Sequence, residues 1–157
     1  MLRPLKQDQI LNHAARFHGH LGPWLALGLR AGRRATKLLK ATPFQLKAVV
    51  HCPRRTPHSC FIDGIQVGSG CTLGKGNIRH VRSSRIWVEF LRLPGRSREK
   101  MIESDAPPKA RLRLEVRPEV STELTIIPPR TESYVTNLAR RVYRRPLSRL
   151  FIETLVD

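Results

Sequence analysis

Two short stretches of the sequence carry residue types that could do chemistry. The first is the His-Gly-His triplet at residues 18–20, and the second is CFIDGIQVGSGCTLGKGN at residues 60–77, which holds two of the three cysteines. Imidazole and thiolate groups are the ligands that zinc and other transition metals favour in proteins. A kink at Gly19 would let His18 and His20 converge, whereas on a regular helix their side chains would diverge by about 200°. Together, the two stretches predict a His/Cys metal pocket.

Cys60 is the third ligand that we expect. We predict a helix over residues 57–67, capped by Thr56, on which Cys60, Asp63 and Gly64 share a face. Free backbone N–H groups and the helix dipole in the first turn should stabilise a Cys60 thiolate, and Gly64 should leave space beside it. The thiolate could be a metal ligand or a nucleophile. A lone cysteine in an apolar helix is more often a small buried hydrophobic residue.

The glycine-rich half of the second stretch, residues 68–77, predicts a loop beside this pocket. Its glycines allow positive φ angles, and Lys75 adds a positive charge. The spacing does not fit the P-loop of nucleotide-binding proteins, so ATP binding is disfavoured. Cys71 could be a fourth ligand, a redox partner of Cys60 or a packed turn residue. The catalytic candidates, if the protein is an enzyme, are Cys60, Asp63 and Lys75.

The segments FHGHLGPWLALGLRAG (17–32) and CFIDGIQVGSGCTLGKGN (60–77) resemble the E-type family of formylmethanofuran dehydrogenase subunits. The resemblance implies an α+β fold, frequent dimerisation and a pocket for zinc or another divalent transition metal. It assigns the metal ligands to His18, His20, Cys60 and Cys71. Many relatives carry a cysteine where this chain has Gly22. Some append a cysteine-rich zinc ribbon, which we do not expect here because no cysteine follows Cys71 in this sequence.

The elements that position these residues indicate one α+β domain over residues 1–157, with a largely antiparallel sheet packed by N-terminal and C-terminal helices. The small side chains at Gly28, Ala31 and Ala35 should let another element approach the second helix closely. We expect the strand at 85–93 to be covered on both faces. The expected elements are helices at 6–16 and 23–40, strands at 46–52, 85–93 and 109–117, and two helices within a basic C-terminal segment at 131–157, the second opened by Pro146.

A net charge of +17 is the strongest global feature of the chain. Such a charge attracts polyanions, anionic membranes or acidic proteins, and arginine suits bidentate contacts to phosphate. The alternative explanation of this charge is a compositional bias or an ordinary solvated surface, without a polyanion partner. The residues that we expect to bind a polyanion are Arg30, Arg33, Arg34, Lys37, Lys40, Arg140, Arg141, Arg144 and Arg145.

The leading hypothesis is a cytoplasmic metal-binding protein of this family, an enzyme or an accessory subunit linked to one-carbon or redox metabolism. The resemblance implies a homodimer. We expect no membrane insertion, because no secretory signal and no apolar run near 18 residues are evident. The alternative is an RNA- or ribosome-associated basic protein that reuses the same scaffold, with a nucleic acid or an acidic protein as its partner. The sequence does not specify a substrate or a reaction.

Overall fold

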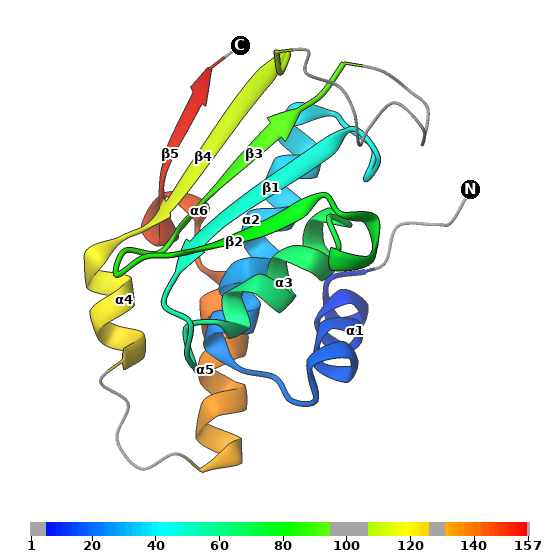
Figure 1. Cartoon of the computed structure of the whole chain (residues 1–157). Helices are drawn as coiled ribbons and strands as arrows, with labels where there is room; N and C mark the ends of the chain where they lie inside the picture. Colours follow the sequence, from blue (N-terminus) through cyan, green and yellow to red (C-terminus); the bar gives the residue numbers. More distant parts are fainter. Residues whose placement is uncertain (1–5, 95–106, 126–130, 157) are drawn as a thin grey trace.

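The computed structural model describes residues 6–94, 107–125 and 131–156. Within these residues five strands form one sheet in the order β2-β1-β3-β4-β5 (Figure 1). β2 runs parallel to β1, and the other neighbours are antiparallel, which confirms the predicted α+β class. The elements are α1 (Gln7–His18), α2 (Pro23–Leu39), β1 (Leu46–Cys52), α3 (Cys60–Ser69), the 3₁₀ turn η1 (Leu73–Lys75), β2 (Ile78–Arg82), β3 (Trp87–Arg92), β4 (Ala110–Val116), α4 (Pro118–Thr125), α5 (Glu132–Arg144), α6 (Leu147–Leu150) and β5 (Phe151–Val156).

The sheet buries one face against the helices. On β3, Val88 and Phe90 are fully buried, whereas Trp87 and Glu89, which alternate with them, are only partly buried. This alternation is typical of an antiparallel sheet with one covered face, so the expectation that residues 85–93 are covered on both faces is wrong. α2 packs against β3 and β4 and also contacts α3 and α5, which lie beside it (Figure 1). No described helix is long and apolar enough to cross a membrane.

α2 and α3 pack backbone against backbone. A β-carbon added at Gly28 would overlap the carbonyl oxygen of Phe61, and one added at Gly64 would overlap the carbonyl oxygen of Leu25. The close approach predicted for the small-residue face of the second helix is therefore confirmed. The side of Gly64 that we expected to leave space beside Cys60 is filled by the α2 backbone. This contact fixes α3, and with it Cys60 and the residues that follow.

The end of the chain differs from the prediction. The second C-terminal helix stops after Leu150, and residues Phe151–Val156 form strand β5. β5 pairs antiparallel with β4 from Val116↔Phe151 to Arg111↔Val156. The free edge of β4 is a long-range partner that a helical spacing of apolar residues does not reveal, and it stabilises a strand in place of the expected helix. The segment 131–157 is therefore only partly helical.

Candidate functional site

The His-Gly-His turn is built by the end of α1. The helix continues to His18, two residues beyond its predicted end, and Gly19 then takes a left-handed conformation with φ 104°. The N–H of Gly19 donates to the carbonyl oxygen of Ala15 at 2.8 Å, which closes the last turn of the helix. The chain reverses there, and the ring centroids of His18 and His20 lie 4.9 Å apart. The predicted convergence of the two imidazoles is therefore present.

His18 is oriented by Asp63 from the middle of α3. Nδ1 of His18 lies 2.6 Å from Oδ2 of Asp63. An ionised carboxylate can only accept hydrogen bonds, so Nδ1 carries the proton and donates. The other ring nitrogen, Nε2, is thereby left as the atom available to a ligand. The side chain of His18 is only 12% exposed, which limits the positions that its ring can take.

Gln66 connects this pair to the glycine-rich loop. Its Nε2 donates to Oδ1 of Asp63 at 3.3 Å, and its Oε1 accepts from the backbone N–H of Leu73 at 3.1 Å. The loop therefore contacts the site through Gln66 and Asp63, and it reaches His18 only indirectly. We expected the loop to lie beside the pocket; in the structure it helps to hold the Asp63 carboxylate in place.

α3 begins at Cys60, three residues later than the sequence predicted. The N–H of Cys60 donates to the carbonyl oxygen of Pro57, and the N–H of Phe61 donates to that of His58, both at 3.1 Å. These bonds span three residues, so residues 57–59 form a tight turn that leads into the α-helix. Cys60 therefore occupies the first helical position, where we expected only that it would lie in the first turn.

The predicted thiolate at Cys60 is not supported. Burial raises the pKa of the Cys60 thiol, and the negative charge of Asp63 raises this pKa further, while a backbone hydrogen bond opposes both effects. The prediction considered the helix terminus alone and omitted desolvation and the neighbouring carboxylate. Cys60 is therefore a protonated thiol at neutral pH until a base or a cation takes its proton.

Cys60 and His20 border a pocket of about 310 Å³. Its walls are mainly apolar, and Glu132 at the start of α5 supplies a carboxylate at its edge. A β-carbon at Gly22 would lie 3.2 Å from Nε2 of His20. Position 22, where many members of the family that this chain resembles carry a cysteine, therefore faces the imidazole of His20. The apolar walls of the pocket are formed by Leu21, Pro23, Trp24, Leu25, Pro57 and Val135.

Cys71 and Lys75 lie away from this pocket. Cys71 follows the C-terminal end of α3, whereas Cys60 begins that helix, and Cys71 is fully buried in the core. Burial raises the pKa of Cys71 to about 11. Nζ of Lys75 donates to Oγ1 of Thr72 at 2.9 Å, within the loop. The structure thus brings His18, His20, Cys60 and Asp63 into one region and leaves Cys71 and Lys75 outside it.

The described residues contain no group of three or more His, Cys, Asp or Glu side chains arranged closely enough to hold a metal ion. The imidazoles of His18 and His20 are neighbours. Of these two histidines, only His20 borders the same pocket as Cys60. The metal-ligand assignments therefore stay predictions.

Sequence reasoning missed Glu132 and a buried polar pair in this region. Nε1 of Trp24 and Nδ1 of His58 have no hydrogen-bond partner among the described residues, and the two ring centroids are 4.9 Å apart. Oγ1 of Thr125 donates to the carbonyl oxygen of Ser121, so it accepts from Nε2 of His58, which leaves Nδ1 as a free acceptor. Trp24 matched an apolar helical face, and no motif marked Glu132 as a neighbour of the pocket. His58, in contrast, lies two residues before Cys60, and this spacing does indicate a reserve ligand.

Three of the arginines predicted to bind a polyanion have internal partners. Arg30 is half-buried and donates to the carbonyl oxygens of Tyr143 and Arg145 at the end of α5. Arg34 makes two hydrogen bonds to Glu153, at 2.7 and 2.6 Å, and Arg145 makes two to Glu123, at 2.7 and 2.5 Å. Three of the nine predicted polyanion-binding residues therefore have structural partners within the protein. The remaining predicted cations are Arg33 and Lys37 on α2, Lys40 at its end, and Arg140, Arg141 and Arg144 on α5.

Comparison with known proteins adds two findings. Residues 17–151 match the family described as FmdE, molybdenum formylmethanofuran dehydrogenase operon. A protein of Archaeoglobus fulgidus, described as a probable S-adenosyl-L-methionine-binding protein, is 34% identical over 80 residues, which cover 46% of this chain. The matching part is 20% of that protein, so this chain corresponds to about a fifth of the relative's length.

Proposed function

The chain belongs to the FmdE family, and on that premise we propose that it is a metal-binding protein, an enzyme or accessory subunit linked to one-carbon or redox metabolism. The proposed ligands are His18, His20 and Cys60, and the proposed metal is zinc or another divalent transition metal. The observation that carries this proposal is the 2.6 Å contact between Nδ1 of His18 and Oδ2 of Asp63. Metal-ligating histidines in proteins commonly donate their second ring nitrogen to such a carboxylate.

The donor set fits the proposed metal in its chemistry. Nε2 of His18 is free, the imidazole of His20 lies beside it, and the thiol of Cys60 borders the same pocket as His20. Because three donors do not converge in this structure, binding requires the side chains of His20 and Cys60 to rotate toward His18. Rotation between staggered rotamers is a small rearrangement for both residue types.

The protein groups divide the work at such a site. Asp63 holds the ring of His18 in one orientation and keeps the proton on Nδ1. The thiol of Cys60 has to release its proton to become a ligand, so ion binding is coupled to proton release. The pocket walls beside His20 and Cys60 are mainly apolar, so a ligand there would meet few other polar groups. An ion held there would supply Lewis-acid polarisation to a small molecule in the pocket.

We further propose that the protein works in the cytoplasm as a homodimer. A reducing compartment suits a chain whose three cysteines are all unpaired thiols in the structure. The S-adenosyl-L-methionine ligand in the name of the Archaeoglobus fulgidus protein is not carried over, because this chain matches only a fifth of that protein.

Metal analysis tests the proposed site. Purified protein is loaded with zinc, dialysed and measured by elemental analysis, and we expect about one ion per chain. The His20→Ala, Cys60→Ser double variant should retain almost none, because two of its three ligands are missing. Cys71→Ser is the matched control and should bind like the wild type, since Cys71 lies in the core. Near-zero zinc in both the wild type and the double variant would overturn the proposal.

Two single substitutions sharpen the test by moving the affinity in opposite directions. Asp63→Asn should weaken zinc binding about 10- to 100-fold, because the carboxylate that orients His18 is lost. Gly22→Cys should strengthen binding, because its thiol would arise next to Nε2 of His20. Glu119→Gln removes an exposed carboxylate from α4 and should leave the affinity unchanged. If Asp63→Asn and Glu119→Gln bind zinc equally well, His18 is not held for a metal.

A further inference from the structure

A groove of about 760 Å³ lies where α2 meets the end of α5. It is lined by Arg33 and Lys37 from α2 and by Arg144 from α5, together with the arginines that have internal partners. The two basic segments of the sequence are thus brought to one concave surface, although more than 100 residues separate Arg33 from Arg144. Neither segment alone would form this surface.

The unpaired positive charge of the groove lies on three side chains. Arg33, Lys37 and Arg144 make no side-chain hydrogen bond or ion pair with another residue in the described part of the chain. Arg30 and Arg34 brace the groove instead, through the end of α5 and through Glu153 respectively. The walls are therefore held in place, and the three remaining cations have no counter-ion among the described residues.

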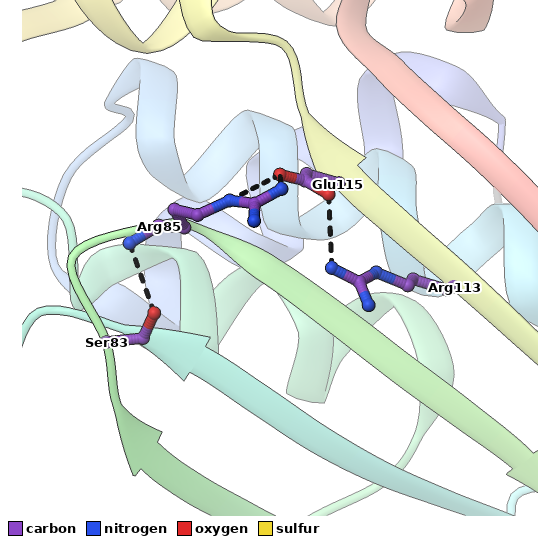
Figure 2. Close-up of polar contacts among 4 residues, drawn as sticks. All are labelled: Ser83, Arg85, Arg113 and Glu115. Carbon is purple, nitrogen blue, oxygen red and sulfur yellow. Dashed lines mark hydrogen bonds and ion pairs between the residues drawn. The ribbon is translucent and has the colours of Figure 1, made fainter.

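On the uncovered face of the sheet, two arginines share one carboxylate of the protein. Arg85 and Arg113 both bind the carboxylate of Glu115, and the backbone N–H of Arg85 donates to Ser83 (Figure 2). The guanidinium of Arg113 also lies 4.0 Å from the ring centroid of Trp87. Because Arg85 and Arg113 are already engaged, they are less available to an external anion than Arg33, Lys37 and Arg144 are.

A second hollow adjoins the groove. It measures about 490 Å³ and shares Arg34 and Leu147 with the groove, and its lining also includes Arg117, which donates to the carbonyl oxygen of Ser148, and Glu153, which pairs with Arg34. A concave surface does not match a flat lipid bilayer. A flexible polymer with a negative charge on every unit can follow it.

We propose that this groove binds the phosphodiester backbone of a nucleic acid strand without reading its sequence. Arginine forks match phosphate geometry, and Arg33, Lys37 and Arg144 offer contacts from two sides. The nearest aromatic side chain, Tyr143, is only 5% exposed, so its ring is not available to stack on a base. Contacts of this kind go to phosphates alone and make binding strongly dependent on salt.

Fluorescence anisotropy with a labelled single-stranded RNA of about 16 nucleotides tests the proposal. The groove variant carries Arg33→Gln, Lys37→Gln and Arg144→Gln. We expect it to bind at least about tenfold more weakly than the wild type at 0.1 M salt, and its slope of log affinity against log salt to be shallower by about 2. DNA of the same sequence should bind like the RNA, because the contacts are to the backbone.

The matched control removes the same charge from another surface. Arg54, Arg55 and Arg82 border a separate hollow of about 690 Å³, and Arg54→Gln, Arg55→Gln, Arg82→Gln should retain wild-type salt dependence. Both variants should keep the wild-type melting temperature, since none of the six side chains makes an ion pair among the described residues. Equal losses in the two variants would assign binding to net charge and overturn the proposal. So would competition by polyglutamate as effective as that by unlabelled RNA, or binding confined to anionic vesicles.

Discussion

Asp63 acts on two neighbours in opposite ways. Its Oδ2 accepts from Nδ1 of His18 and fixes that ring, and its charge raises the pKa of Cys60. The carboxylate that prepares one ligand therefore disfavours the anionic form of another. A cation placed among the three groups would reverse this effect on the thiol, because it attracts both negative charges. The arrangement suits a metal site better than a free thiolate nucleophile.

The pairing of Cys60 with Asp63 could be predicted from their three-residue spacing, and the convergence of His18 with His20 could be predicted from Gly19. The protonation state of Cys60 could not, because it depends on how much of the thiol α2 and the pocket walls bury. Desolvation arises from residues distant in the sequence, and a local helix-terminus argument does not contain it.

The buried thiols predict a loss of stability at alkaline pH. Burial raises the pKa values of Cys52 and Cys71 to about 11 each. Unfolded thiols lose their protons near pH 8.5, so between these values the folded state holds more protons than the unfolded state. The free energy of unfolding should therefore be unaffected below about pH 8.5 and fall as the pH rises toward 11.

Denaturant unfolding at pH 8 and pH 10.5, under reducing conditions, measures this loss. The wild type should lose about 4 kcal/mol more over that interval, about 2 kcal/mol for each thiol, than a Cys52→Ala, Cys71→Ala variant, which has no thiol to titrate at these positions. The comparison uses the change with pH, so a lower starting stability of the variant does not affect it. Parallel pH profiles would show that these thiols do not titrate differently in the folded state.

At the scale of elements, the contact between α2 and α3 predicts a strict requirement for glycine. Gly28→Ala would push a methyl group into the carbonyl of Phe61, and the backbone of α3 cannot yield without moving Cys60 and Asp63. We expect the free energy of unfolding to fall by about 1–3 kcal/mol or more, as in other overpacked cores. Gly74→Ala is the control, because a β-carbon there meets nothing within 4 Å. Similar melting temperatures for the two variants would contradict the close packing.

The elements also show where sequence patterns succeed. The boundaries of α2 and β1 could be read from Pro23, from helical spacing and from the β-branched run at 46–52, because those signals are local. The start of α3 and the identity of β5 could not. Leu147, Leu150, Phe151 and Leu155 match helical spacing, yet the last two lie in a strand because β4 offers an unpaired edge. Strand pairing between distant segments decided the outcome.

At the scale of the whole molecule, the excess positive charge is organised by the fold. The sequence identified both basic segments, but it did not show that they share a groove. Nor did it show that Arg30, Arg34 and Arg145 have partners inside the protein. Ion pairs such as Arg34–Glu153 join residues 119 positions apart, and no local pattern predicts them. The free cations are therefore fewer than the composition suggests, and they are more concentrated.

The predicted homodimer has a specific candidate surface in β5. This strand ends the sheet, and Ile152 and Val156 expose 45% and 57% of their surface. Pairing of β5 with β5 of a second copy would satisfy the free backbone groups of both edges and cover these side chains. Two chains that each carry a net charge of +17 also repel each other. Added salt should therefore strengthen the dimer, whereas it should weaken the binding of nucleic acid.

Light scattering after size exclusion at 0.05 M and 0.5 M salt checks this prediction. The wild type should shift toward twice the mass of one chain as the salt concentration rises. An Ile152→Lys, Val156→Lys variant should remain monomeric at both concentrations, because each substitution places a charge where apolar contact is needed. Leu73→Lys is the control; Leu73 is 79% exposed in η1, away from β5, and its substitution should leave the shift intact. A dimer that survives in the β5 variant would place the interface elsewhere. A wild-type dimer that dissociates as salt is added would show that charge complementarity, and not apolar edge pairing, holds the two chains together.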